Sequence, residues 1–468
     1  MDLRFAAASQ LAAAIRRKEL SPVELMRWTL ARLAQVNPQL NAFVALRNEE
    51  ELLQEAQAVA ERLARGDEVG PLAGLPLGVK DLEDVAGLPN THGSLIYRDN
   101  ISTRDTIQVQ RLKRAGAIVI GKTNTPEFGY TAFTTNRLFG PTRNPWNLER
   151  TPGGSSGGSA AAIAGGMVAL ATASDGGGSV RIPAAYTGLV GLKPCQGRIP
   201  WGPESALRVS HCIVSGPLAR TVEDAALWLD VTVGPHPDDP YSLPHPGISY
   251  REAIRQPLPR LRIAYSATLG YARPARAVQQ EVERALAALA AAGHRIEPVE
   301  LSLSDIVLDW AKLMAMEDYA FHGANFHDEE LLDPGYRVGV ELARHLKPAD
   351  LGEVLRLRAE LNATISRIFE RFDLLATPTT ATEAFAAEGP IPFEVDGEPV
   401  ATPGGGIAYT YPFNFTGHPA ISLRAGLTAE RLPVGIQFVG PRLREDLLLQ
   451  LAAEYEQLRP WHEEWPEL

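Results

Sequence analysis

The stretch TPGGSSGGSAAAIAGG, residues 151–166, restricts the fold more than any other part of this sequence. Glycine and serine at this density are typical of flexible linkers. Here, however, the run continues into SAAAIAGGMVALATAS, a small-residue helix pattern that belongs in a tightly packed core. We therefore interpret the stretch as part of a rigid, buried site and not as a tether between domains.

Two glycine-rich nucleotide-binding motifs do not fit this stretch. The P-loop requires a lysine that residues 151–166 lack, and the Rossmann pattern G-x-G-x-x-G fails at Gly154, where its third position is Ser156. The GGSSG of residues 153–157 matches the nucleophile elbow of α/β-hydrolases. That elbow follows a strand, whereas NPWNLERTP precedes it here with two prolines and no apolar run. An α/β-hydrolase is thus the weaker interpretation.

A second glycine cluster, DGGGSVR, occupies residues 175–181. Three successive glycines allow backbone N–H groups to converge on one point, as an oxyanion hole or anion nest requires. Ser179, directly after the glycines, is placed like a nucleophile. The alternative is a tight turn with a purely structural role.

A serine nucleophile needs a base, and the histidines of this chain form no suitable pattern near these segments. Lysine is rare, with seven in the chain, and three of them lie in apolar contexts: Lys80, Lys122 and Lys193. Burial lowers the pKa of a lysine by up to about 3–5 units, enough to make it a base at neutral pH. The residues alone leave open which of the three acts, and an ion pair, for instance with Asp81, is the structural alternative.

Helical patterns alternate with short apolar runs along the chain, which predicts an α/β fold. Ser21-Pro22-Val23-Glu24 forms a capping box at the start of a helix. The apolar runs at residues 74–81 and 115–124 predict buried strands, and residues 276–292 predict a helix. The proline-rich residues 234–247 predict a surface loop, with a domain boundary as the alternative.

Much of the sequence resembles the amidase signature family. The resemblance is carried by residues 153–200, which match the Ser/Gly-rich signature, and by GLPLGVKD, GKTNTPEFGY, FGPTRNPWN, PFNFTGHPAIS and LPVGIQFVG. It implies one α/β/α domain over residues 1–468, with a central mixed sheet covered by helices on both faces. Its parts would be a helical segment at about 1–65, the signature core at about 70–233 and a substrate-side and C-terminal part at about 248–468.

The resemblance also implies a Ser–cis-Ser–Lys triad. The family's lysine corresponds to Lys80, its bridging serine to Ser155 and its nucleophile to Ser179. The backbone N–H groups from Gly176 through Gly177 and Gly178 to Ser179 would form the oxyanion hole. Asp175-Gly176-Gly177 departs from the family's frequent Asp-Thr-Gly, although a three-glycine form also occurs among its bacterial hydrolases.

Family membership would leave the substrate open. The A subunits of glutamyl-tRNA amidotransferases usually carry Gln where this chain has Ile182, which favours a stand-alone hydrolase of small aryl or alkyl amides, oligoamides, esters or carbamates; such an amidotransferase component is the alternative. The segment after PEFG resembles the family's acyl-site segment. The expected substrate-binding residues are Tyr130, Phe133, Thr134, Ser156 and Ile407, and His322 and Met316 are candidates for a substrate-side helix.

Composition bounds the partners. The net charge of −11, without a basic run, argues against nucleic acid or an anionic membrane as a partner. Two cysteines and the lack of a signal-peptide pattern favour a cytoplasmic protein. We expect no cofactor, no metal, a small-molecule substrate, and a monomer or homodimer.

Overall fold

The computed structural model describes residues 2–202, 210–400, 402 and 404–468. The helices are α1 (Ala8–Arg16), α2 (Pro22–Leu40), α3 (Glu49–Arg65), α4 (Ile107–Arg114), α5 (Gly157–Ala164), α6 (Arg181–Thr187), α7 (Val222–Thr232), α8 (Tyr250–Ala253), α9 (Arg276–Ala291), α10 (Val307–His322), α11 (Pro334–His345), α12 (Pro348–Ile368), α13 (Tyr411–Phe415) and α14 (Glu445–Leu458). The strands are β1 (Phe43–Leu46), β2 (Pro76–Lys80), β3 (Ile118–Thr123), β4 (Leu170–Ala171), β5 (Ser174–Asp175), β6 (Val190–Lys193), β7 (Val214–Ser215), β8 (Leu218–Ala219), β9 (Arg262–Tyr265), β10 (Arg295–Pro298), β11 (Leu374–Pro378), β12 (Glu394–Val395), β13 (Glu398–Pro399), β14 (Ala420–Leu427) and β15 (Pro433–Val439).

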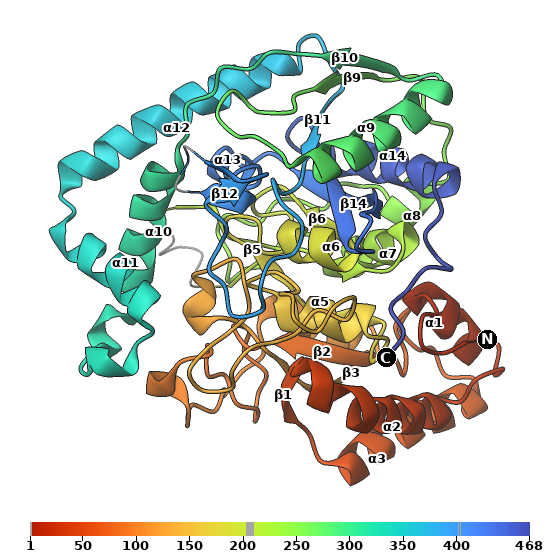
Figure 1. The fold of residues 1–468 in the computed structure, drawn as a ribbon. Coiled ribbons are helices and arrows are strands. Elements are labelled where there is room, and N and C mark those ends of the chain that lie inside the picture. The colour runs from red at the N-terminus through yellow and green to blue at the C-terminus, as the bar shows by residue number, and fades with distance from the viewer. Residues whose placement is uncertain (1, 203–209, 401, 403) are drawn as a thin grey trace.

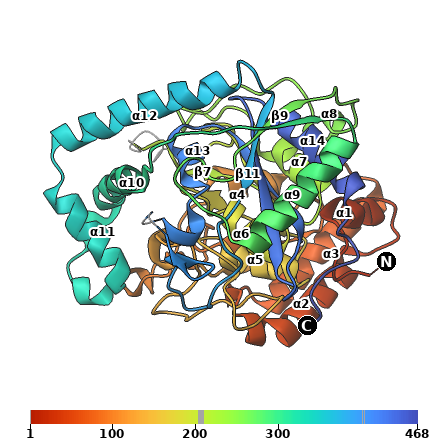
Figure 2. The same cartoon turned by 45° about the horizontal axis from the view of Figure 1, so that its top comes forward.

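A large mixed sheet forms the centre of the molecule (Figure 1). Among the described residues it has 11 strands, in the order β1-β3-β2-β4-β8-β6-β14-β15-β11-β9-β10. β2 pairs in parallel with β3 and β4, whereas β14 pairs antiparallel with β6 and β15. Helices flank the sheet on both sides, as the second view of the cartoon also shows (Figure 2). The predicted α/β class with a mixed central sheet is confirmed.

The local signals of the sequence correspond to the observed elements. Ser21 caps α2: its hydroxyl accepts from Val23 N, and the Glu24 carboxylate accepts from Ser21 N. The predicted capping box is therefore present. The apolar runs became β2 and β3, which are buried along their whole length. The predicted helix at residues 276–292 is α9, and the proline-rich loop at residues 234–247 contains no helix or strand.

The small-residue stretch lies in the core. Every residue of α5 is buried, and its alanines pack with residues of α2, β3 and β4 in one hydrophobic cluster. Gly158 shows why size is limited here, because a Cβ would lie 2.3 Å from the Asn124 backbone nitrogen. Only side chains this small let the helix approach the sheet so closely, which excludes the linker interpretation.

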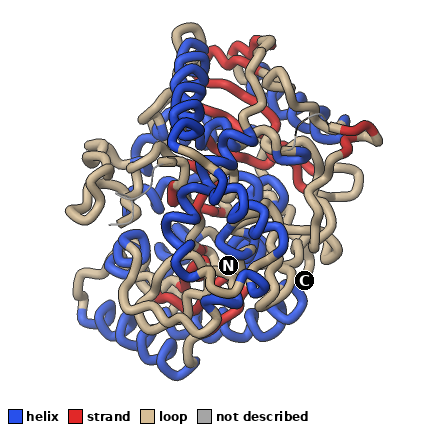
Figure 3. Tube along the Cα trace, turned by 90° about the vertical axis from the view of Figure 1, so that its left-hand side faces the viewer, coloured by secondary structure: helices blue, strands red, loops and turns tan. Residues whose placement is uncertain are grey.

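Helices α10, α11 and α12 lie together along one side of the molecule in both cartoon views (Figures 1 and 2). Most strands lie in the interior with helices around them (Figure 3). In the described part of the chain, no helix is long and apolar enough to cross a membrane. Within the same ranges, no three His, Cys, Asp or Glu side chains gather as a metal site would require.

Candidate active site

Lys80, the last residue of β2, is fully buried at the centre of a group of hydroxyls. Its Nζ lies 2.8 Å from the Oγ of Ser155, 2.8 Å from the Oγ of Ser156 and 3.1 Å from the Oγ of Ser174. Burial lowers the pKa of Lys80 to about 7, against the weaker opposing pull of Glu83 and Asp175. A substantial fraction of this amine is therefore neutral near pH 7.

The two serines of GGSSGG precede α5 and contact the same amine. The Gly154–Ser155 peptide bond is cis, as the resemblance implied. Ser156 is buried, and its hydroxyl donates to the Ser174 carbonyl. Gly154 has no room for a side chain, because a Cβ would lie 2.6 Å from the Phe133 nitrogen. The glycine-rich loop thus holds two hydroxyls against Lys80.

The other two candidate lysines have different surroundings. Lys122 donates to the Glu83 carbonyl at 2.5 Å and lies 3.5 Å from an Asp81 carboxylate oxygen, so it is a buried ion-pair partner. Burial lowers the pKa of Lys193 to about 8, but its amine donates to the Pro194 carbonyl and contacts no serine hydroxyl in the described ranges. Of the three lysines, Lys80 is the one whose described hydrogen bonds go to serine hydroxyl groups.

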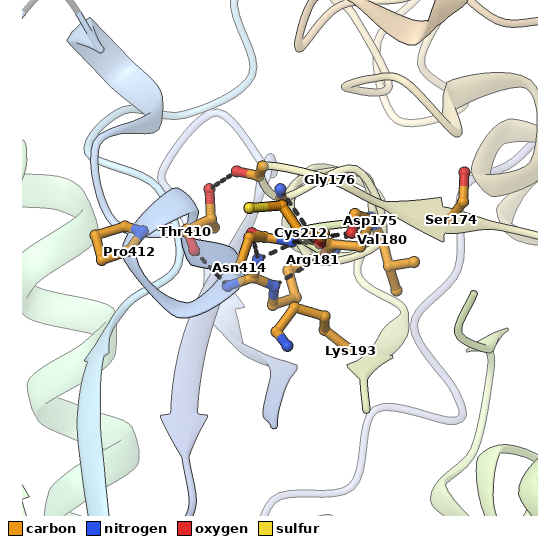
Figure 4. A network of polar contacts seen from close by, with 12 residues as sticks. Ser174, Asp175, Gly176, Val180, Arg181, Lys193, Cys212, Thr410, Pro412 and Asn414 are labelled. Carbon is orange, nitrogen blue, oxygen red and sulfur yellow. Dashed lines mark hydrogen bonds and ion pairs between the residues drawn. The ribbon is translucent and has the colours of Figure 1, made fainter. Parts of the chain in front are cut away.

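A buried charge network fixes the second glycine cluster (Figure 4). The Arg181 guanidinium donates to both oxygens of the Asp175 carboxylate, at 3.0 and 2.9 Å, and both side chains are fully buried. Asn414 donates to Asp175 and accepts from Arg181. Burial raises the pKa of Asp175, yet the Arg181 charge outweighs it and holds that pKa at about 2. The loop that carries Ser179 is thus held in place by the ion pair between Asp175 and Arg181, which stays charged at neutral pH.

The glycine loop that leads into Ser179 has backbone N–H groups that, within the described part of the chain, are free to bind a substrate oxygen, except that of Gly178. Gly178 N donates to Asp175 Oδ1 at 2.8 Å, so this N–H is already used. The N–H groups of Gly177 and Ser179 make no hydrogen bond to any residue that the structure describes. Both residues line a cavity.

That cavity has a volume of about 370 Å³ and brings the two glycine clusters together. Ser155, Ser174 and Ser179 all line it, and Ser179 is partly exposed. Aromatic side chains surround much of the remainder: His92, Phe128, Tyr130, Trp310, Tyr319, His322 and Tyr336. Phe128 stacks on Tyr336 with ring centroids 4.7 Å apart. The site is a concave, largely apolar chamber with hydroxyls at one place, as small-molecule sites usually are.

The structure separates the five expected substrate-binding residues into two groups. Tyr130 and Ile407 line the cavity, and the Tyr130 hydroxyl donates to Asp333 at 2.6 Å. Phe133, Thr134 and Ser156 are not among the residues that line this cavity.

Each of the three has a packing or framework role instead. Phe133 packs edge-on against Phe385 in a small apolar cluster. Thr134 is fully buried, donates to the Gly153 carbonyl and accepts from Gly157 N, so it braces the serine loop. Ser156 is turned to Lys80.

The sequence reasoning missed most of the wall that α10 and α11 contribute. The two candidates for a substrate-side helix, His322 and Met316, both lie on α10. His322, Trp310 and Met314 of this helix line the cavity, whereas Met316 is not among the lining residues. Met314 and Trp310 lie about two and about three helical turns before His322 on α10. The spacing of four residues between Trp310 and Met314, which places both on one face of the helix, was the available signal.

Comparison with known proteins shows which family the chain belongs to. A family model described as Amidase matches residues 24–449. An acylamidase of Rhodococcus erythropolis is 37% identical over 99% of this chain and 98% of its own length. The glutamyl-tRNA(Gln) amidotransferase A subunit of Carboxydothermus hydrogenoformans is 35% identical over 100% of both chains. A solved bacterial aryl acylamidase superposes with a TM-score of 0.93 at 29% identity, covering 98% of each chain. The chain belongs to the amidase signature family and is an amide-hydrolysing enzyme.

Proposed function

We propose that this enzyme cleaves a C–N amide bond through an acyl-enzyme on Ser179, with Lys80 as the base and Ser155 as the proton relay. The observation that carries the proposal is the buried Lys80 amine 2.8 Å from the Ser155 hydroxyl, in a site whose cavity Ser155 shares with Ser179. A base must lie within hydrogen-bond reach of the proton it removes. Among the described contacts of the three buried lysines, those of Lys80 meet that requirement.

The mechanism moves one proton out and back along a chain of three residues. Neutral Lys80 takes the hydroxyl proton of Ser155 while Ser155 takes that of Ser179, whose Oγ forms a bond to the substrate carbonyl carbon. The proton returns through Ser155 to the leaving nitrogen as the C–N bond breaks. Water, activated by the same relay, then attacks the acyl-enzyme and releases the acid, so that the serine regains its proton.

The glycine loop would stabilise the negative charge that develops on the substrate oxygen. The N–H groups of Gly177 and Ser179 are available for this, and Gly176 contributes backbone to the same wall. One such donor is worth roughly 2.7–4 kcal/mol in comparable sites. We therefore leave Gly178 out of the expected set of four oxyanion-hole donors, because its N–H already donates to Asp175.

The substrate is proposed to be a small aryl or alkyl amide, an oligoamide, an ester or a carbamate. The aromatic wall of the cavity suits a flat apolar group, since aromatic pairs gain about 0.5–1.5 kcal/mol beyond the burial of area. The names of two relatives, acylamidase and aryl acylamidase, point to the same substrates. We propose that the enzyme works on these as a monomer or homodimer, without nucleic acid or a cofactor.

The second candidate function is that of the A subunit in a glutamyl-tRNA amidotransferase, and the 35% identity to such a protein is the observation in its favour. The test compares the purified chain alone on p-nitroacetanilide and phenyl carbamates with a glutaminase assay in the presence of the other amidotransferase components. Anilide hydrolysis by the chain alone supports the hydrolase. Glutaminase activity that appears only with those components would replace it with the second candidate.

A further inference from the structure

Trp310 of α10 contacts the glycine loop from the side of the cavity wall. Its indole Nε1–H donates to the Gly176 carbonyl at 2.9 Å, and its ring stacks on Tyr411 at a centroid distance of 5.9 Å. The ring also covers Gly177: a Cβ added there would lie 2.5 Å from the indole Cζ2. A residue 131 positions after Ser179 thus lies against the segment that leads into it.

The contact with the carbonyl determines where the next N–H points. The carbonyl of Gly176 and the N–H of Gly177 belong to the same peptide unit, which is planar, and in a trans unit the two point in opposite directions. The cis bonds of the described residues lie elsewhere, before Ser155 and before Pro390. By holding the Gly176 carbonyl, the indole therefore turns the Gly177 N–H away from itself, and this N–H has no acceptor among the described residues.

A second donor holds the following peptide unit in the same way. The Thr410 hydroxyl donates to the Gly177 carbonyl at 2.5 Å, and the N–H of that unit, on Gly178, donates to Asp175. Gly178 has φ +135°, a conformation that L side chains rarely adopt, and a Cβ there would lie 2.3 Å from the Thr410 hydroxyl. Two successive carbonyls are thus fixed by side chains from α10 and from the segment before α13.

We propose that Trp310 is a positioning residue for the oxyanion hole, its indole N–H aiming the Gly177 N–H at the substrate oxygen through the Gly176 carbonyl. This inference rests on the proposed function. Such a residue acts on the charged oxygen of the transition state and not on the neutral substrate, so its loss lowers kcat more than it raises KM.

The test compares Trp310→Phe with Trp146→Phe. Trp146 is a matched control, because its Nε1–H also donates to a backbone carbonyl at 2.9 Å, that of Thr187, and it does not line the cavity. Trp310→Phe keeps an aromatic ring and removes the donor. We expect kcat for an anilide to fall about tenfold, less than the roughly 10²–10³-fold for loss of a donor itself. KM should change by less than about threefold, and Trp146→Phe should leave kcat unchanged.

Inhibitors give a second readout. An aryl trifluoromethyl ketone forms an oxyanion on the serine, whereas the corresponding secondary alcohol fills the cavity without one. Trp310→Phe should weaken the ketone by the same factor as kcat/KM and leave the alcohol unchanged. Replacing Trp310 by 3-benzothienylalanine, which substitutes sulfur for the indole N–H at nearly constant shape, should reproduce the loss if the phenylalanine variant folds poorly.

The outcomes separate the two claims. If the wild-type enzyme neither binds the ketone nor forms an adduct on Ser179, the proposed function itself fails. If it does both and the two Trp310 variants keep wild-type kcat and ketone affinity, or lose ketone and alcohol affinity equally, the role of Trp310 is refuted.

Discussion

The pH dependence of hydrolysis follows from the environment of Lys80. Burial lowers the pKa of this amine from 10.5 to about 7. A base must be deprotonated, and at pH 7 the neutral fraction is about one half with the lowered pKa but about 3 in 10,000 with the ordinary one. Burial thus increases the active form about 10³-fold. Activity should therefore rise with pH up to about 7 and level off above it.

The assay is kcat/KM for an anilide between pH 5 and pH 10, which reports groups of the free enzyme. Below pH 7 we expect a slope of one, a tenfold loss per pH unit. Lys80→Arg is the matched variant, because it keeps a cation but cannot lose its proton, and it should be inactive across the range. A profile that is flat down to pH 5, or one that keeps rising to pH 10, would refute the assignment of Lys80 as a base with a lowered pKa.

Four further expectations concern neighbouring groups. Ser155→Ala should lower kcat by at least about 10²-fold without a change in fold, because the relay between base and nucleophile is cut; circular dichroism and kcat check it. Gly177→Ala should lower kcat at least about tenfold, since its Cβ displaces the Trp310 ring, and a wild-type kcat would contradict this. Asp175→Asn should cost about 3–5 kcal/mol in urea unfolding, because Arg181 stays buried without its counter-charge. Lys80→Met should gain stability relative to wild type as the pH falls from about 10 to 7, by up to about 1.4 kcal/mol per pH unit. The reason is that Lys80 of the unfolded wild-type chain is protonated in this range, whereas Lys80 of the folded chain has released its proton. A difference in unfolding free energy between the two proteins that does not change with pH would contradict this.

The sequence predicted individual helices and strands well. Of their arrangement in space it predicted only the fold class, an α/β fold with a mixed sheet. The Ser21 capping box and the β2 apolar run are short-range signals, so their elements appear where expected. The order of strands in the sheet depends on contacts between distant segments, and β2 lies beside β4 across more than ninety residues. Patterns within a window of a few residues do not encode that neighbour.

The candidate site likewise has a part that the sequence predicted, the catalytic lysine, and a part that it did not, the wall of the pocket. Residues alone selected three lysines, and the family resemblance singled out Lys80; geometry then placed its amine among the serine hydroxyls. The pocket was harder, because Thr134 and Ser156 are polar residues near the catalytic loops whose side chains turn inward to the framework. Trp310 comes from a helix 131 residues after Ser179, and no local pattern links the two.

Covalent labelling of the nucleophile tests the central claim most directly. The wild-type enzyme is treated with a fluorophosphonate at pH 8, where Lys80 is mostly neutral, and the modified peptide is mapped by mass spectrometry. We predict one adduct, on Ser179, which is absent from Ser179→Ala and slowed in Lys80→Arg. An adduct on Ser155, or labelling that does not depend on Lys80, would contradict the proposed triad.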